Sequence, residues 1–421
     1  MALSLRNAVR SLAINTVLVR ERMQSGLAFN PMSARLAQDP YPIFARLRER
    51  DPVHRSLLMD AWVFSRHADV DAILRDHRRF ASDPRKRERA RQRQARMRPE
   101  DYSMLFLDPP DHTRLRNLVN KAFTRRAVTG LEPHIRAHVT ALLDAVDGPA
   151  GFDLMEAVAM PLPVIVIAEM LGVPPEDRAR FKTWSARRAR LLEPTLSARE
   201  REIGARAATS LNEYFLPIIE KRRADPRDDI ISALAQAEEA GDRLTEREML
   251  TLLRLLLAAG NETTTNLIGN GMLALLRNPG QLQALRDDPG LIPSAVEELL
   301  RFDSPVQTNF RGATEDCEVN GHPVKRGEAA VLLLGAANRD PAEFPQPDRL
   351  DITRQPRSHV AFGRGIHHCL GAPLALLEGR IVIEMLIERF ASIRLLTDRA
   401  TFRNSVVLRG LESLPIAATP A

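Results

Sequence analysis

One segment of the chain gathers glycine, histidine and cysteine more densely than folding alone requires. It reads Phe362-Gly363-Arg364-Gly365-Ile366-His367-His368-Cys369-Leu370-Gly371. Glycine tolerates positive φ and the close approach of other backbone, so its repeated use here predicts a tight loop. The loop would deliver Cys369 to the start of the next helix, where amide donors and the helix dipole stabilise a thiolate. Such a thiolate could be a nucleophile or a metal ligand.

Zinc is the first alternative for a cysteine that directly follows two histidines. A zinc site needs three or four ligands that converge from separated positions. No second cysteine or histidine pair stands at zinc spacing near Cys369, and the pattern therefore disfavours zinc. A buried structural cysteine is the ordinary alternative, but it leaves the glycines around it unexplained.

A second group of reactive side chains lies inside a long predicted helix. Thr245 with Glu248 three residues later forms a capping box, which predicts where the helix begins. Pro279 predicts where it ends. Residues 252–257 are apolar on nearly every face, which indicates that the helix is buried all round. Polar residues 260–266 nevertheless follow within the same rod.

Two of these polar residues have chemical potential. The hydroxyl of Thr263 can bond the carbonyl one turn back, and we expect it to loosen the helix into a local bulge. Glu262 is a carboxylate on a buried element, so it needs either an ion pair or a role in proton transfer. A third pair, Glu298 and Arg301, lies at i, i+3 on a predicted helix and can pair across one face. Such pairs occur by chance on most helices.

Helical periodicity dominates the elements that must position these residues, and short strands interrupt it. We expect a mainly α fold with a minor β region. A hairpin is expected from 52–58 and 61–65, turning at Met59-Asp60. Helices are expected at the N-terminus and over 111–147 (interrupted near Gly130 and Pro133), 161–171, 199–223, 245–278, 294–302 and 372–390. Further strands are expected over 306–311, 329–334, 393–396, 405–408 and 415–417.

Composition narrows the class of protein. The chain has 421 residues and a net charge of +6, from 60 Lys and Arg against 54 Asp and Glu. Its 2 cysteines cannot build a disulfide scaffold and favour a reducing, cytoplasmic location. No stretch reaches the ~18 consecutive apolar residues of a membrane span. The arginine-rich run 85–98 lacks aromatic residues to stack on bases, which argues against nucleic acid. Two interpretations of this run stay open: it is a solvated loop, or it contacts a carboxylate of a substrate.

Taken together and in this order, the three motifs resemble those of the cytochrome P450 family. The loop fits the heme signature Phe-Gly-x-Gly-x-His-x-Cys-x-Gly at every fixed position. Glu298 and Arg301 fit the Glu-x-x-Arg motif, and 259–263 fits the oxygen-activation motif Ala/Gly-Gly-x-Asp/Glu-Thr. Asn261 departs from the histidine of many bacterial members. The resemblance spans roughly residues 39–414 and implies the P450 fold, with a long central helix and a heme-thiolate loop.

The resemblance implies a role for each matching residue. Cys369 would be the thiolate ligand of the iron in heme b. The other residues implied to bind the cofactor are His112, Arg116, Arg311, His367, Gly260, Phe362 and Gly363, the first four of them at the heme propionates. Glu262 and Thr263 would deliver protons to dioxygen at the heme. Glu298 and Arg301 would be structural and tied to Arg339 or its neighbours.

The same resemblance implies a monooxygenase that inserts one atom of O2 into a small molecule by hydroxylation or epoxidation. The implied substrate pocket consists of Met104, Leu105, Phe106, Leu255, Ala258, Ala259, Val306, Gln307, Val406 and Val407. These side chains are largely aliphatic, so we expect a fatty acid, terpenoid or steroid-like substrate. A desaturase, an oxidative coupling enzyme, a peroxide-using variant and a non-oxygenating heme sensor or carrier share the motifs and remain alternatives.

The length of the chain suits one heme domain, 31–421, with an N-terminal extension, 1–30. About 400 residues go into such a domain, which leaves none for a fused flavin reductase. Electrons from NAD(P)H would therefore arrive through a ferredoxin and its reductase. Ferredoxins are usually acidic, so we expect a basic docking surface with residues such as Arg114, Arg125, Arg126 and Arg364.

Overall fold

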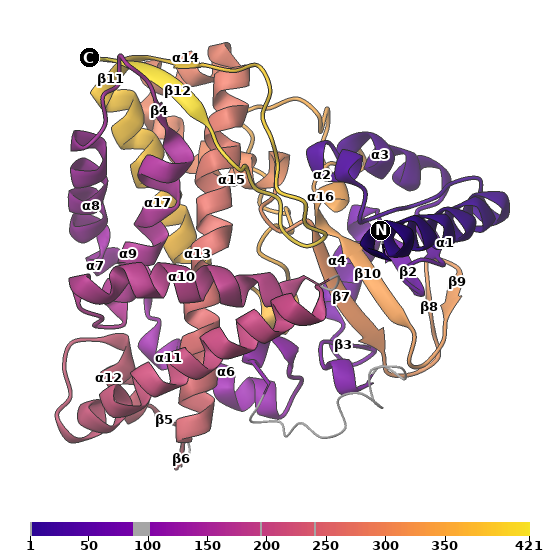
Figure 1. Cartoon of the computed structure of the whole chain (residues 1–421), viewed down its shortest axis with the longest axis horizontal. Coiled ribbons are helices and arrows are strands. Elements are labelled where there is room, and N and C mark those ends of the chain that lie inside the picture. The colour runs from indigo at the N-terminus through magenta and orange to yellow at the C-terminus, as the bar shows by residue number, and fades with distance from the viewer. Residues whose placement is uncertain (1, 87–101, 194–195, 240) are drawn as a thin grey trace.

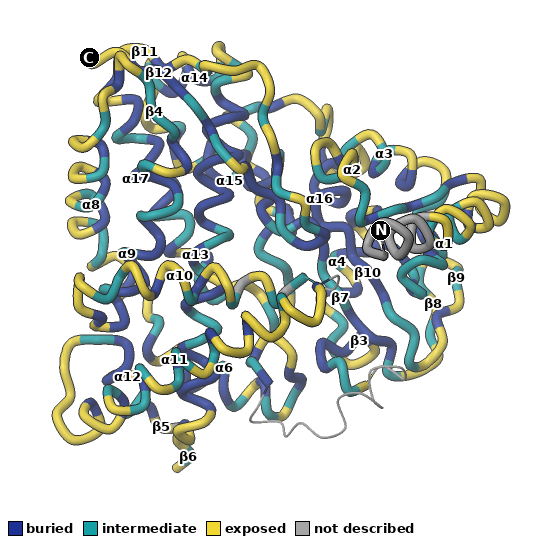
Figure 2. Tube along the Cα trace, viewed as in Figure 1, coloured by how far each residue is buried: buried dark blue, intermediate teal, exposed yellow. Residues whose placement is uncertain are grey.

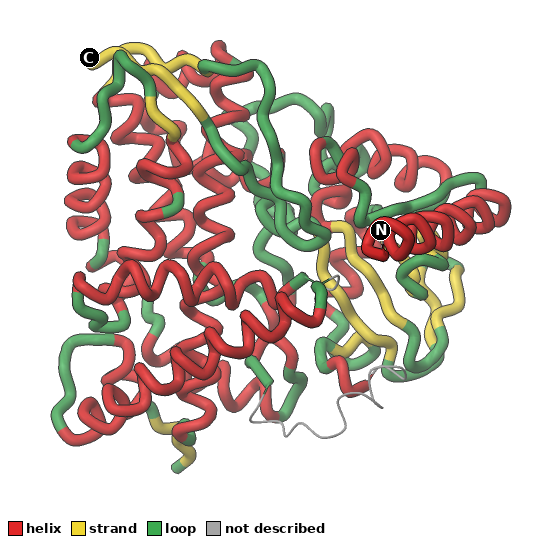
Figure 3. Tube along the Cα trace, in the orientation of Figure 1, coloured by secondary structure: helices red, strands yellow, loops and turns green. Residues whose placement is uncertain are grey.

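The structure is a computed structural model that describes residues 2–86, 102–193, 196–239 and 241–421. It is mainly helical, as predicted, with most of the long helices on one side and the larger sheet, together with α1 to α4, on the other (Figures 1 and 3). The helices are α1 (Ala2–Ser25), α2 (Ala34–Gln38), α3 (Tyr41–Arg50), α4 (His67–Arg75), α6 (Asp111–Ala122), α7 (Arg125–Gly130), α8 (Glu132–Asp144), α9 (Pro161–Met170), α10 (Arg178–Ala189), α11 (Ala198–Ala224), α12 (Ile230–Gln236), α13 (Glu246–Arg277), α14 (Pro279–Asp287), α15 (Ile292–Phe302), α16 (Leu334–Ala337) and α17 (Ala372–Arg389).

The strands form two sheets and two isolated pairs. The five-stranded sheet has the order β1 (Val53–Ser56), β2 (Ala61–Phe64), β10 (Ala329–Leu333), β7 (Thr308–Ala313) and β3 (Phe80–Ala81). A three-stranded sheet joins β11 (Phe390–Leu395), β12 (Pro415–Pro420) and β4 (Phe152–Asp153). The pairs are β5 (Glu238–Glu239) with β6 (Asp242–Arg243), and β8 (Cys317–Val319) with β9 (His322–Val324).

The predicted hairpin is confirmed. Strands β1 and β2 are antiparallel, with Val53 opposite Phe64, and Asp60 takes a positive φ of 49° in the turn. Strand β10 runs parallel to β2 and alternates its side chains, so that Leu332 faces one apolar cluster while Val331 and Leu333 face another. The sheet is thus buried on both faces.

Helix α13 forms the axis of the helical part and packs against α9, α10, α11, α15 and α17. The Thr245 capping box is present, and the helix ends at Arg277, next to Asn278 and Pro279. Figure 2 shows the interior around α13, α15 and α17 as largely buried. Leu252, Leu253 and Leu257 are buried, so the predicted burial of 252–257 is confirmed in part. Arg254, Leu255 and Leu256 are only partly covered, the two leucines because they face a cavity.

Two expectations about elements are wrong, and several elements were not predicted. Helix α13 is continuous, so the bulge at Thr263 is wrong: its hydroxyl does bond the Ala259 carbonyl (2.7 Å), but as an additional donor that leaves the helix intact. Helix α10 was not predicted, and neither was the break before α7, where the Thr124 side chain caps the helix. The strand expected at 405–408 is absent: only Leu408 is paired, in an isolated bridge to Val306. The Glu193 carboxylate accepts hydrogen bonds from the amides of Val406 and Val407, which a strand would use for pairing.

Helix α1 is joined to the five-stranded sheet by one buried carboxylate. Glu21 accepts hydrogen bonds from the backbone amides of Phe29 (2.7 Å) and Leu57 (2.8 Å), and its Oε1 lies 2.8 Å from Nε2 of His54. The contact fixes how the helix sits against β1 and the turn that follows it. Within the described ranges, no helix is both long enough and apolar enough to cross a membrane.

Candidate active site

The cysteine loop adopts the tight conformation that its glycines predicted. Gly363 and Gly365 have φ of 68° and 67°. The Cys369 amide donates to the Phe362 carbonyl at 2.9 Å, which closes the loop just before α17. A Cβ on Gly365 would lie 2.7 Å from the Leu74 carbonyl oxygen, so the loop is pressed against the end of α4 and only glycine fits.

The sulfur of Cys369 sits at the N-terminus of α17. Burial raises the pKa of the thiol, while amide hydrogen bonds from Gly371 and Ala372 and the nearby Arg116 guanidinium act in the opposite direction. These groups stabilise negative charge on the sulfur. Although Cys369 is exposed, it lines an internal cavity, so its accessible surface faces that space.

This cavity has a volume of about 690 Å³ and lies between α13 and the cysteine loop, with parts of β7 and β10 in its wall. Both predicted proton-transfer residues, Glu262 and Thr263, line it. So do the predicted cofactor residues His112, Arg116, Arg311, His367, Cys369, Gly260, Phe362 and Gly363. The predicted pocket residues that line it are Met104, Leu105, Phe106, Leu255, Ala258, Ala259, Val306, Val406 and Val407.

Gln307 is the predicted pocket residue that does not reach the cavity. Its side-chain amide donates to the Ser304 carbonyl at 2.8 Å and packs against Gly335. Val306 and Thr308, its neighbours in sequence, both line the cavity. Successive side chains of extended backbone point to opposite faces, so Gln307 is directed away.

A basic cluster lines the part of the cavity wall near Cys369. The rings of His112 and His367 lie 4.2 Å apart between centroids, and Nδ1 of His112 and Nε2 of His367 are buried without a hydrogen-bond partner. Burial and neighbouring cations lower the pKa of His112 to about 4 and that of His367 to about 2. Arg311 is also buried and donates to Asn309 Oδ1 (2.5 Å) and the Phe310 carbonyl (2.8 Å).

Arg116 completes the cluster. Burial lowers the pKa of its guanidinium, with the sulfur of Cys369 acting in the opposite direction. Among the described residues it forms no hydrogen bond or ion pair. Orphaned buried donors are costly unless a ligand supplies acceptors. The donor set therefore fits a cofactor that brings carboxylates, and the apolar walls fit the rest of a porphyrin.

Glu262 and Thr263 face the cavity from α13. Burial raises the pKa of Glu262, although Arg403 and Arg190 act to lower it, and no partner for its carboxylate is found within the described part of the chain. The Thr263 hydroxyl donates to the Ala259 carbonyl. Asn261, at the position where the motif varies, donates to Ser185 Oγ at 3.1 Å and so ties α13 to α10.

Glu378 is a cavity residue that sequence reasoning missed. It lies on α17, is 2% exposed, and leaves its Oε2 without a hydrogen-bond partner. Burial raises the pKa of its carboxyl to about 8. The available signal was a single acidic residue in 374–383, a mostly apolar stretch that also contains Arg380. That signal alone could not distinguish a buried carboxyl from a solvated one.

The predicted Glu298–Arg301 pair is fully buried and does not line the cavity. Arg301 Nε and Nη2 lie 2.7 Å and 2.8 Å from the two Glu298 oxygens, and Nη1 donates to the Asn338 carbonyl at 2.9 Å. The pair is thus tied to a neighbour of Arg339, as expected. A second arginine, Arg354, lies 3.3 Å from the Glu298 carboxylate, and sequence reasoning missed it. Arg339 itself pairs with Asp348 at 3.0 Å.

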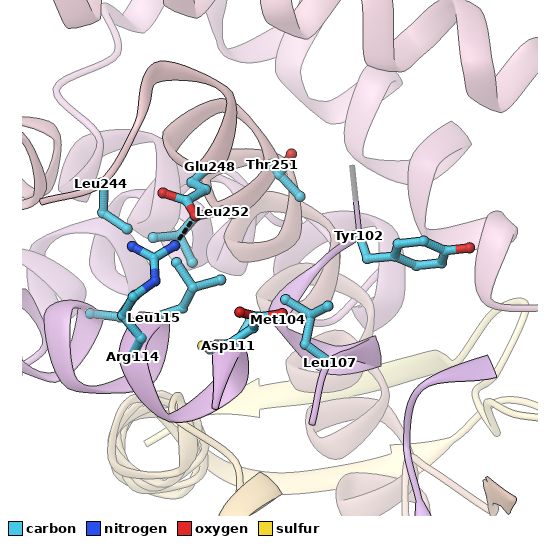
Figure 4. A pocket seen from close by; sticks show the side chains of 11 residues that line it. Tyr102, Met104, Leu107, Asp111, Arg114, Leu115, Leu244, Glu248, Thr251 and Leu252 are labelled. Atoms are coloured by element: carbon cyan, nitrogen blue, oxygen red, sulfur yellow. Dashed lines mark hydrogen bonds and ion pairs between the residues drawn. The ribbon is translucent and has the colours of Figure 1, made fainter. Parts of the chain in front are cut away.

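A smaller cavity of about 260 Å³ lies between α6 and the start of α13 and shares Met104 with the large one (Figure 4). Figure 4 shows Arg114 directed at Glu248, with which it forms an ion pair, and Arg114 also pairs with Asp242 at 3.1 Å. Arg114 is therefore paired with two carboxylates, and its place on a basic docking surface stays a prediction.

The arginine-rich run falls largely outside the described residues, since 87–101 are not described. The side chain of Arg125 is also outside them. At the start of the run, Arg85 pairs with Asp83 at 2.9 Å and Lys86 with Asp108 at 2.9 Å. Among the described residues, no group of three His, Cys, Asp or Glu side chains is arranged to hold a metal ion.

Comparisons with known proteins agree with this geometry. A family model described as Cytochrome P450 matches residues 56–289 and 290–407. Cytochrome P450 107B1 of Saccharopolyspora erythraea is 44% identical over 90% of this chain and 95% of its own length. Vitamin D(3) 25-hydroxylase of Pseudonocardia autotrophica is 44% identical over 91% and 94%.

Among solved structures, the Bacillus subtilis bacillaene polyketide synthase cytochrome P450 PksS superposes with a TM-score of 0.85. It is 40% identical and covers 93% of this chain and 100% of that one. A family model that spans most of the chain, and full-length relatives above 40% identity, agree with the cysteine loop and its cavity. The chain belongs to the cytochrome P450 family.

Proposed function

We propose that this cytochrome P450 monooxygenase hydroxylates or epoxidises an apolar small molecule held between α13 and the cysteine loop. Membership of the family assigns it heme b, O2 and electrons that originate from NAD(P)H. The heme, when bound, supplies the redox chemistry that activates O2. The observation that carries the proposal is one cavity, walled by aliphatic side chains, that joins Cys369 to Glu262 and Thr263.

Cys369 is the proposed iron ligand. The amides of Gly371 and Ala372 stabilise negative charge on its sulfur. His112, Arg116, Arg311 and His367 are the proposed partners of the heme propionates, because cationic and N–H donors bind carboxylates strongly. The two unpartnered imidazole nitrogens support this role.

Glu262 and Thr263 are the proposed route for protons. Thr263 lines the cavity and carries a hydroxyl. The residue before it, Glu262, has a carboxyl whose raised pKa favours the protonated form. Arg403 and Arg190 lie close enough to influence Glu262. Glu262 is the member of this group that can relay a proton, because arginine keeps its own. The apolar wall excludes other water, which limits unproductive protonation.

The proposed substrate is a fatty acid, terpenoid or steroid-like compound. Leu255, Val306, Val406 and Val407 supply aliphatic contact area for such a compound. The name of one relative supports a steroid-like compound, since that enzyme hydroxylates vitamin D3. The name of another places it in polyketide biosynthesis.

A spectroscopic titration tests the proposal. A bound apolar substrate excludes water from the iron and shifts the heme Soret band, and the same compound should then be oxidised with O2 and reductant. Cys369→Ser should abolish the red-shifted Soret band of the reduced carbon monoxide complex, which marks thiolate ligation. If Cys369→Ser retains that band, the ligand assignment is wrong. Compounds that bind but are never oxidised would favour a heme sensor or carrier.

We also propose a ferredoxin as the immediate electron donor. Arg126 is exposed on α7, which packs against the helix that starts beside the cysteine loop. Arg364 lies in the loop itself, where it pairs with Asp71 at 3.4 Å. Arg126→Glu should slow reduction by an acidic ferredoxin and weaken its salt dependence. Arg206→Glu, at an exposed arginine of α11, is the control. Equal rates in both variants would exclude Arg126 from docking.

A further inference from the structure

Helix α1 displays the most exposed apolar side chains among the described residues. Leu12 is 69% exposed, Val19 60% and Met23 82%, whereas the other exposed large hydrophobic residues lie between 38% and 45%. Large exposed apolar groups that lie together usually mark an interaction surface. Figures 1 and 2 show α1 at the periphery of the molecule, with exposed residues along its outer side.

These three residues form one line along the helix. Successive helical residues are rotated by about 100°, so Val19 and Met23 each lie within about 20° of Leu12. We call this line the α1 stripe. Glu21, at about 180° from Leu12 by the same count, points the opposite way. It is buried against Phe29, His54 and Leu57. The stripe is therefore held outward by the same contact that attaches the helix.

The charges around the stripe have one sign. Arg20 and Arg22 are both exposed, and by helical rotation they lie about 80° to either side of Leu12. Helix α1 carries four arginines and a single acidic residue, Glu21, which is buried. An apolar stripe flanked by arginines is typical of helices that lie in the interface of an anionic bilayer. Long arginine side chains can reach the headgroups while the apolar residues enter the acyl region.

A second copy of the chain fits this surface less well. A symmetric dimer would place stripe against stripe and bring the flanking arginines of both copies together. Anionic phospholipids instead supply the complementary charge. We propose that α1 is an interfacial helix that docks the protein on an anionic lipid surface, with Leu12, Val19 and Met23 inserted and Arg20 and Arg22 at the headgroups.

The attachment of α1 gives this docking a consequence for the cavity. Glu21 accepts a hydrogen bond from the Leu57 amide. The next two residues, Leu58 and Met59, line the large cavity. Pro31 and Met32, which follow α1, line it as well. Docking through α1 would thus hold this wall of the cavity in a fixed relation to the bilayer, where apolar compounds concentrate.

Sedimentation with vesicles tests the proposal on the full-length, heme-loaded protein. The parent should bind vesicles of phosphatidylglycerol and phosphatidylcholine, bind pure phosphatidylcholine less, and lose affinity as salt rises. Replacing Leu12, Val19 and Met23 together by serine should lower the partition coefficient by about tenfold or more. Arg20→Gln with Arg22→Gln should lower it several-fold on anionic vesicles only.

The chain provides a matched control. Ile203 and Leu396 are exposed by 38% and 45% outside α1, and replacing both by serine should leave vesicle binding unchanged. The Soret band and circular dichroism verify that each variant is folded. The proposal is overturned if the parent ignores anionic vesicles, or if the serine variant binds them equally well. It is also overturned if the parent is a dimer that the serine variant converts to a monomer, because the stripe is then a contact between copies.

Discussion

The hydroxyl of Thr263 lines the cavity and bonds the Ala259 carbonyl one turn back. Removing this hydroxyl should leave the helix and the heme in place, because it is an additional donor to the helix, but the cavity then lacks the hydroxyl group proposed to pass on protons. We expect Thr263→Ala to keep consuming O2 and reductant while product per O2 falls on the order of tenfold, with hydrogen peroxide released instead. Thr263→Ser keeps the hydroxyl and should stay coupled. Measuring peroxide and product together checks this, and a tightly coupled alanine variant would contradict the role.

Glu378 should make the protein less stable as pH rises. Burial raises the pKa of its carboxyl to about 8 in the folded chain, against an ordinary value of 4.5. Between these values the folded state keeps a proton that the unfolded state has lost. The free energy of unfolding therefore falls with pH, by up to ~1.4 kcal/mol per unit.

Glu378→Gln keeps the volume of the side chain and removes its ionisation, so urea unfolding at pH 5.5 and pH 8 should show a smaller fall than in the parent. Parallel falls in both proteins would mean that Glu378 is ionised in the folded state.

Residues recognised by a motif were predictable, and isolated ones were not. Cys369, Glu262 and Thr263 stood in patterns whose spacing is itself informative, and all three line the cavity. Glu378 and Arg354 stood alone in the sequence. Their importance depends on burial and on partners such as Glu298, and neither is visible without the fold.

At the scale of elements, the cysteine loop depends on two glycines with different constraints. Both Gly363 and Gly365 have left-handed φ, which costs a residue with a side chain ~1–2 kcal/mol. A Cβ on Gly365 would also lie 2.7 Å from the Leu74 carbonyl, whereas one on Gly363 finds its nearest atom at 3.8 Å. We expect Gly365→Ala to lower heme retention and the thermal midpoint clearly more than Gly363→Ala. Equal losses would show that the contact with α4 is not what fixes the loop.

The elements with explicit boundary signals were those that the sequence predicted well. Helix α13 begins at a capping box and ends just before a proline, and its predicted bounds are nearly correct. Helix α10 was missed because its sequence is rich in arginine, and only Phe181 and Ser185 are buried among its described side chains. The strand expected at 405–408 does not form, and the amides of Val406 and Val407 instead donate hydrogen bonds to Glu193, which is distant in sequence.

The arrangement of the whole molecule was beyond composition and periodicity. The five-stranded sheet pairs β2 with β10, which lie far apart in the chain. One sequence contains no signal for such a pairing, and the fold was expected only through the resemblance of the motifs. The same limit applies to the cavity, whose wall brings Leu58, Thr263 and Val406 together.

At this scale the attachment of α1 should respond to pH. Burial alone would lower the pKa of His54, but its hydrogen bonds with Asp51 and Glu21 raise it to about 9. Both ring nitrogens of His54 lie next to a carboxylate: Nδ1 is 2.7 Å from Asp51 and Nε2 is 2.8 Å from Glu21. Unfolded histidine titrates near 6.5, so the folded chain holds an additional proton between about pH 6.5 and 9. The stabilisation is complete below pH 6.5 and is lost as pH rises through 9.

The prediction is best tested in a Glu378→Gln variant, because the ionisation of Glu378 overlaps this pH range. We expect its free energy of unfolding to fall by ~2–3 kcal/mol between pH 6.5 and 9.5. Adding His54→Gln should flatten that fall, because glutamine carries no proton to lose. Asp51→Asn removes one of the two anionic partners and should move the fall to lower pH. Urea midpoints across the range measure all three. If the fall persists unchanged without His54, the imidazole is neutral in the folded protein, and uncharged hydrogen bonds alone attach α1 to the sheet.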